Sequence, residues 1–138
     1  HWLVLDHVGK PCIRDWNTRS EVPSRWLASL RALAAMPHVV CKLSGLVTEA
    51  DWTAGNGLQS QDAKTMLECF DRALDLFGPN RILFGSDWPV CQPAAPFDAV
   101  PGLALGWANT RLTAQEQNAF WSGNAQRCYD LKPSAALS

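Results

Sequence analysis

Short apolar runs alternate along the chain with longer segments in which apolar residues recur every three or four positions. The apolar runs cover residues 2–5, 38–43 and 81–84 and have the length and composition of buried strands. Residues 61–77 show the clearest helical periodicity, because their apolar and charged positions separate onto two faces. Residues 24–35 carry a similar apolar face and predict an earlier helix.

Local signals mark where the predicted helices begin and end. Ser24 is the expected N-cap of the first helix, and Gly78-Pro79 ends the second one directly before the third strand. Thr113-Ala114-Gln115-Glu116 has the capping-box pattern that starts a further helix, which is expected to break or restart at Gly123-Asn124. Strands that alternate with helices favour an α/β fold in which parallel strands are joined by helical crossovers.

Two segments lack periodicity. Residues 46–60 predict a long loop, and loops of that length in compact domains often cover a site. Residues 132–138 are expected to fray beyond a single domain that covers residues 1–131.

Composition and charge limit the classes of partner. The 138 residues are 47% hydrophobic, which is enough apolar material for one core, and the net charge is −1 from 12 basic and 13 acidic residues. No basic cluster suggests a nucleic-acid or anionic-membrane surface, so a small, roughly neutral molecule is the expected partner. No apolar stretch approaches the about 20 residues of a membrane helix, and the start does not resemble a signal peptide. We therefore expect a cytoplasmic protein, whose oligomeric state the sequence leaves open.

The five cysteines are odd in number, widely spaced and without a CxxC pair. They are interpreted as reduced, mostly buried thiols. A zinc site that uses Cys12, Cys41 or Cys91 together with His7 is the alternative interpretation.

Polar residues follow the C-terminal ends of two predicted strands, which are called strand exits here. Asp87 comes after the strand at 81–84, where Gly85 and Pro89 prevent the strand from continuing, and Asp6-His7 follow the first strand. In sheets covered by helices, the carboxyl ends of the strands are where loops build active sites. We therefore expect the two exits to face one pocket, although Asp87 could instead cap the following turn.

Three segments together resemble the C-terminal part of an amidohydrolase-related family. They are Leu5 to Pro11, Cys41 to Leu46 and Phe77 to Val90. The resemblance is to its sugar-lactonase group, which includes enzymes similar to L-fuconolactonase, rhamnonolactonase and 2-pyrone-4,6-dicarboxylate lactonase. It implies the last three β/α units of a (β/α)₈ TIM barrel, with His7 at the end of the sixth strand and Asp87 at the end of the eighth.

The family's first-strand His-x-His is absent, and the chain begins inside a strand without methionine. We interpret the chain as a fragment that lacks part of its site, and we expect it to be inactive alone.

The resemblance implies hydrolysis of a sugar-derived lactone in carbohydrate catabolism. Asp87 is then the general base that takes a proton from water, and His7 is a donor that polarises the carbonyl. Trp88 and Trp52 are candidate pocket walls, although core packing explains both at least as well. Lys42 is a candidate substrate contact, although a single lysine in a strand is usually a packed stem with a solvated head.

Two alternatives to a metal-free lactonase remain open. No cofactor is expected for the lactonase reaction, but in a metal-dependent amidohydrolase or decarboxylase His7 and Asp87 would bind a divalent ion such as zinc. In a different class, the chain is a non-catalytic fragment that associates through its open sheet edge.

Overall fold

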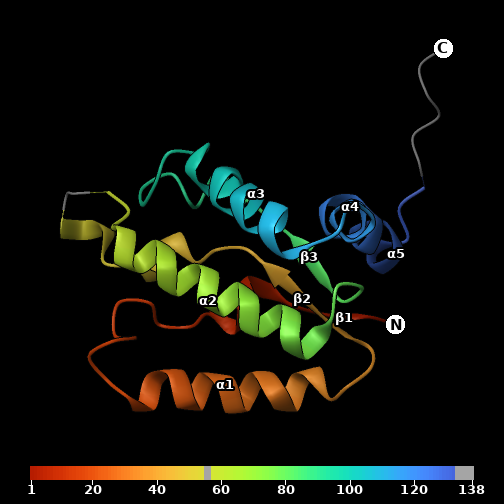
Figure 1. Ribbon diagram of the computed structural model, residues 1–138, viewed down its shortest axis with the longest axis horizontal. Helices are drawn as coiled ribbons and strands as arrows, with labels where there is room; N and C mark the ends of the chain where they lie inside the picture. The colour runs from red at the N-terminus through yellow and green to blue at the C-terminus, as the bar shows by residue number, and fades with distance from the viewer. Residues whose placement is uncertain (55–56, 133–138) are drawn as a thin grey trace.

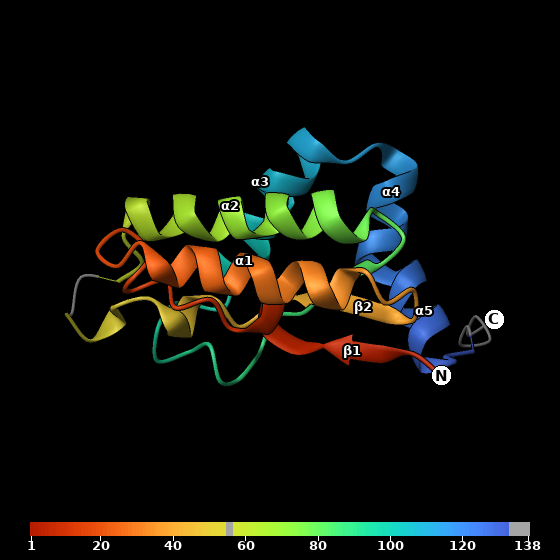
Figure 2. The ribbon, with the colours of Figure 1, turned by 90° about the horizontal axis from the view of Figure 1, so that it is seen from below.

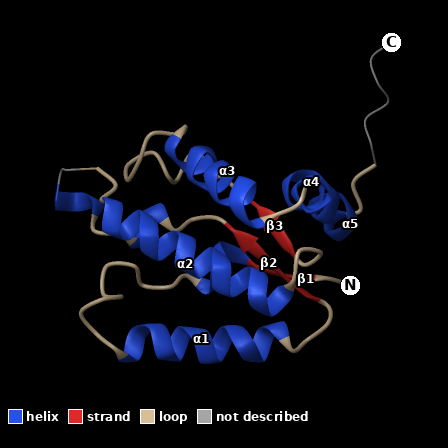
Figure 3. Ribbon diagram, in the orientation of Figure 1, coloured by secondary structure: helices blue, strands red, loops and turns tan. Residues whose placement is uncertain are grey.

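A three-stranded parallel sheet forms the centre of the computed structural model, which describes residues 1–54 and 57–132. The strands are β1 (Leu3–Leu5), β2 (Val39–Leu43) and β3 (Ile82–Phe84), in the spatial order β1-β2-β3. Leu5 pairs with Cys41, and Cys41 pairs with Ile82. Because all three strands run in the same direction, their carboxyl ends meet at one edge of the sheet (Figure 3). The α/β class with parallel strands is confirmed.

Two crossover helices cover one face of this sheet. They are α1 (Glu21–Ala34) and α2 (Ser60–Phe77), which lie side by side above the strands in Figure 2. Beneath them, the inward-facing residues of the strands pack with those of α2 in the hydrophobic core, among them Cys41, Leu43, Ile82, Met66 and Phe70. The core therefore fixes the sheet against the helices and leaves the strand ends free to carry polar groups.

The remaining helices follow β3. α3 (Ala99–Arg111) packs beside α2, and α4 (Ala114–Asn118), a π-helical turn (Ala119–Gly123) and α5 (Asn124–Tyr129) form a nearly continuous segment beside β3 (Figure 1). Of the helices described in residues 1–54 and 57–132, none is both long and apolar enough to cross a membrane.

Several local predictions are confirmed and others are wrong. The capping box at Thr113 is present, and its Oγ1 accepts a hydrogen bond from the backbone N–H of Glu116 at 3.3 Å. Ser24 is not an N-cap, since α1 already begins at Glu21. Pro23 is tolerated there because N–H groups in the first turn of a helix have no acceptor within it.

Two segments were predicted to be less regular than they are. At Gly123-Asn124 the helix does not break but restarts, since the π-helical turn ends at Gly123 and α5 begins at Asn124. The loop at 46–60 contains two 3-10 turns, Val47–Glu49 and Trp52–Ala54, and its residues 55–56 lie outside the described residues. The predicted frayed tail, apart from Lys132, also lies outside them.

Candidate active site

His7 leaves β1 through a left-handed turn. His7, Val8, Gly9 and Lys10 all have positive φ, between 51° and 69°. This conformation costs a non-glycine residue about 1–2 kcal/mol, so the surrounding contacts must hold it. Val8 is fully buried, and its carbonyl accepts a hydrogen bond from the indole N–H of Trp26 at 2.8 Å. The turn is therefore anchored on α1.

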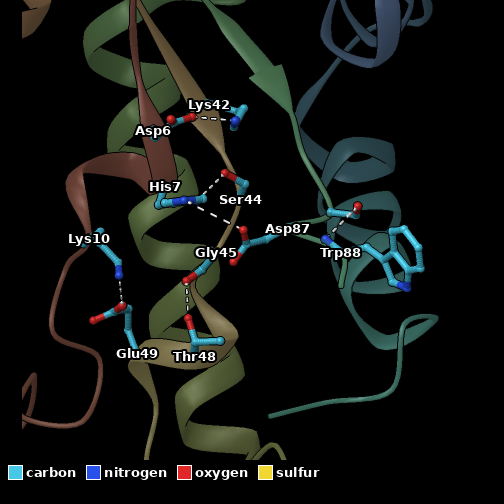
Figure 4. A network of polar contacts seen from close by, with 11 residues as sticks. Asp6, His7, Lys10, Lys42, Ser44, Gly45, Thr48, Glu49, Asp87 and Trp88 are labelled. Atoms are coloured by element: carbon cyan, nitrogen blue, oxygen red, sulfur yellow. Dashed lines mark hydrogen bonds and ion pairs between the residues drawn. The ribbon is translucent and has the colours of Figure 1, made fainter. Parts of the chain in front are cut away.

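This turn directs the His7 imidazole toward the end of β2 and the loop after β3 (Figure 4). Its Nδ1 lies 2.9 Å from the hydroxyl oxygen of Ser44, the residue directly after β2. Its Nε2 lies 3.8 Å from Oδ1 of Asp87. The His7 and Asp87 side chains are 25% and 16% exposed, so both are largely shielded by protein yet still reached by solvent.

Gly45 leaves the room that the imidazole occupies. A Cβ atom at Gly45 would lie 2.3 Å from Nδ1 and 2.6 Å from Cγ of His7. Gly45 also has φ of +66°, a conformation that residues with a side chain rarely adopt. Two independent requirements thus favour glycine at this position.

Asp87 points its carboxylate at His7 because its own backbone is left-handed, with φ of 58°. Aspartate tolerates this conformation better than most residues. The side-chain hydrogen bond in the following turn is made by Ser86, whose hydroxyl accepts from the backbone N–H of Trp88 at 3.3 Å. The hydrogen bond in this turn is thus made by Ser86, whereas the contact described for the Asp87 carboxylate is the one with His7.

The other predicted site residues, Lys42, Trp88 and Trp52, differ in how they lie relative to His7 and Asp87. The ammonium of Lys42 lies 2.5 Å from a carboxylate oxygen of Asp6, and this pair stands beside His7 on the strand side (Figure 4). Trp88 is 61% exposed and points away from Asp87. Trp52 is half-buried and packs against the hydrophobic core. The structure thus brings Asp87, His7 and Lys42 to one edge, and substrate contacts by Lys42, Trp88 and Trp52 stay predictions.

Ser44 and Gly45 belong to the segment Cys41 to Leu46 that carries the family resemblance, but the sequence predicted no role for either residue. The signal was their position directly after β2, which places them between the exits of β1 and β3. A serine and a glycine at a strand end are so common that the residue types alone could not identify them.

The zinc site built from cysteines and His7 is not formed. Within residues 1–54 and 57–132, no group of three or more His, Cys, Asp or Glu side chains could hold a metal ion. Cys41 and Cys91 are buried, and all five cysteines are free thiols. Burial raises the pKa of the Cys41 thiol to about 12, which makes it a poor metal ligand near neutral pH.

Comparison with known protein families shows which family this chain belongs to. The family described as amidohydrolase matches residues 3–131. The chain belongs to the amidohydrolase family. The part matched by this family includes all three strands and both His7 and Asp87.

Two curated relatives of this amidohydrolase chain are lactonases. L-fucono-1,5-lactonase of Burkholderia multivorans is 55% identical over 135 residues, which are 98% of this chain and 45% of that protein. L-fucono-1,5-lactonase of Burkholderia ambifaria is 40% identical, over 96% of this chain and 43% of that protein. The amidohydrolase chain thus spans less than half the length of these relatives.

Solved structures support the same fold. A crystal structure of a Burkholderia multivorans amidohydrolase with bound zinc is 56% identical, superimposes with a TM-score of 0.90, and covers 96% of this chain and 45% of that one. A second crystal form with bound HEPES gives a TM-score of 0.92 at 55% identity. The amidohydrolase chain therefore has the architecture of three consecutive β/α units of a (β/α)₈ barrel, incomplete within the residues described.

Proposed function

We propose that the protein containing this chain hydrolyses a sugar-derived lactone, with Asp87 as general base and His7 as hydrogen-bond donor. The observation that carries the proposal is the convergence of His7 and Asp87 across 3.8 Å at the carboxyl ends of β1 and β3. This separation is too long for a hydrogen bond, so both groups keep hydrogen-bonding capacity for water and substrate. The relatives named as L-fucono-1,5-lactonases support a lactone as the substrate class.

Lactone hydrolysis requires a nucleophilic water and a polarised carbonyl. In the proposed reaction the Asp87 carboxylate accepts a proton as the water oxygen attacks the carbonyl carbon. The Nε2–H of His7 donates to the carbonyl oxygen, which gains negative charge in the tetrahedral intermediate. Asp87 then returns the proton to the ring oxygen as the ester bond breaks, and the product is an open-chain hydroxy acid.

The test is hydrolysis of a panel of aldonolactones by the protein at its natural length. We expect turnover of at least one sugar lactone, and the Asp87→Asn variant should lose about 100-fold or more of kcat. Asp75→Asn, which changes an exposed aspartate on α2, is the matched control and should keep full activity. Lack of turnover with every lactone, or an unchanged rate for Asp87→Asn, would refute the proposal.

A metal-dependent hydrolase is the second candidate, and the zinc in the 56% identical structure favours it. Two ligands that each lie about 2.1 Å from a zinc ion can be at most about 4.2 Å apart. The 3.8 Å between Nε2 of His7 and Oδ1 of Asp87 meets that limit, so these two atoms fit as two of the ligands. A third protein ligand would have to come from outside the residues described here. A divalent ion bound there would supply Lewis-acid activation.

Metal analysis separates the two candidates. The purified protein is assayed for bound metal, and lactone hydrolysis is measured before and after chelation. Activity that survives complete metal removal supports the metal-free reaction, whereas activity that is lost and then restored by zinc supports the metal-dependent one.

A further inference from the structure

Ser44 stands out because its buried hydroxyl contacts an imidazole nitrogen of the proposed site. The residue is 3% exposed, and its Oγ lies 2.9 Å from Nδ1 of His7. A serine hydroxyl can donate to an unprotonated nitrogen or accept from an N–H. A neutral imidazole carries its proton on only one nitrogen, so the direction of this bond decides which tautomer His7 adopts.

Asp87, on the other side of the His7 imidazole, favours one direction for the hydrogen bond between Ser44 and Nδ1. Nε2 faces a carboxylate oxygen of Asp87 at 3.8 Å. An N–H at Nε2 points a positive dipole at that oxygen, whereas a lone pair at Nε2 points electron density at it. Electrostatics therefore favours the proton on Nε2, and Nδ1 is left as the acceptor of the Ser44 hydroxyl.

The backbone around His7 sets where the imidazole lies. The backbone of His7 is held in the left-handed turn, and the ring lies where a Cβ of Gly45 would otherwise be. Ser44 and Gly45 are consecutive residues, so the same segment at the end of β2 sets both the place of the imidazole and its hydrogen bond.

We infer that Ser44 is a positioning residue whose hydroxyl donates to Nδ1 and holds neutral His7 in the Nε2–H tautomer, aimed at the space beside Asp87. The expected effect on catalysis rests on the proposed lactone hydrolysis, because that reaction uses the Nε2–H as its donor. The tautomer itself can be measured without any substrate.

The first test is ¹⁵N NMR of the imidazole nitrogens in metal-free protein, at a pH where His7 is neutral. The chain has three histidines, so a His7→Gln variant assigns the signals of His7. We expect the shift of an unprotonated, hydrogen-bonded Nδ1 and a protonated Nε2, and a mixture of tautomers in Ser44→Ala. A protonated Nδ1 in the unaltered protein, or an unchanged spectrum in Ser44→Ala, overturns the inference.

The second test is kinetic. Ser44→Ala should lower kcat by about 10–100-fold and change KM by less than about three-fold, since partners that orient an active-site histidine have effects of this size. Ser44→Thr keeps the hydroxyl oxygen and should recover most of kcat. Thr65→Val removes an equally buried hydroxyl on α2, which donates to the Gln61 carbonyl of the same helix, and it should leave kcat unchanged.

The two tests distinguish the failure of each proposal. If the protein hydrolyses no lactone, the proposed function fails and the NMR measurement still decides the role of Ser44. If lactones are hydrolysed but Ser44→Ala has the kcat of the unaltered protein, the positioning role fails and the lactonase proposal stands.

Discussion

Gly45 and His7 are so close that the residue at position 45 can carry no side chain without moving the imidazole. A Cβ there would lie 2.3 Å from Nδ1 and 3.1 Å from Cβ of His7. Contacts under 3.0 Å between a Cβ and a ring do not persist, so either the ring or the chain would have to shift. The histidine at the end of β1 thus depends on a glycine that follows β2, 38 positions later in the sequence.

Gly45→Ala should therefore remove the proposed activity. We expect at least an about 100-fold loss of kcat/KM, because a displacement of about 1 Å in a catalytic group can have that effect. Gly57→Ala is the matched control, since Gly57 has nearly the same φ, +65°, but no atom within 4 Å of its Cβ position. It should lose about 1 kcal/mol of stability from backbone strain and keep its activity. Equal kinetic losses in both variants would contradict the steric explanation.

Variants of Lys42 and Asp6 can show whether Lys42 contacts the substrate or only balances the charge of Asp6. The Lys42 side chain is 25% exposed and that of Asp6 is 58% exposed. If Lys42 contacts the hydroxyls of the lactone, Lys42→Met should raise KM about ten-fold, whereas Asp6→Asn should leave KM nearly unchanged. Neither variant should change the free energy of unfolding by more than about 1 kcal/mol, because partly exposed ion pairs contribute little. Steady-state kinetics measures KM for both variants. An equal rise in KM would show that the pair acts only through its charge balance.

Asn124 is expected to stabilise the outer strand of the sheet. Its side-chain NH₂ donates to the carbonyls of Pro79 and Ile82 at 2.8 and 2.7 Å, and the residue is fully buried. Asn124→Ala leaves both carbonyls without this donor and should lower the free energy of unfolding by about 2–3 kcal/mol in denaturant titrations. Asn109→Ala, at an exposed position of α3, should change it by less than about 0.5 kcal/mol. A similar effect of both changes would mean that the buried amide is not the cause.

Thiol reactivity should follow burial. Desolvation raises the pKa of Cys41 to about 12 and also raises that of Cys69, so both thiols stay protonated well above neutral pH. Near pH 8 the Cys41 thiol is therefore almost entirely protonated, and its reactive thiolate fraction rises with pH. Iodoacetamide should therefore label the half-buried Cys12 of the folded protein long before Cys41, as peptide mass spectrometry can show. Labelling of both at one rate in folded protein would contradict the buried environment of Cys41.

The elements that the sequence predicted best are those whose signal is local. The amphipathic stripe at 61–77 became α2, and the capping box at Thr113 formed, because both depend on residues within a few positions of each other. The start of α1 was misplaced because Ser24 resembles an N-cap, while Pro23 is acceptable inside a first helical turn. Ser24 instead donates its hydroxyl to the carbonyl of Ser20 at 2.8 Å.

The sequence by itself determined the parallel α/β arrangement and the two strand exits that carry His7 and Asp87, because periodicity and turn residues encode these features locally. Only the tertiary structure decided which side chains meet there. The directions of His7 and Asp87 follow from left-handed backbone conformations, and the turn that carries His7 is anchored on α1 by the hydrogen bond from Trp26 to Val8. No pattern in the sequence reports those dihedral angles. The roles of Ser44 and Gly45 emerge for the same reason, since their contacts join residues nearly 40 positions apart through the alignment of β1 and β2.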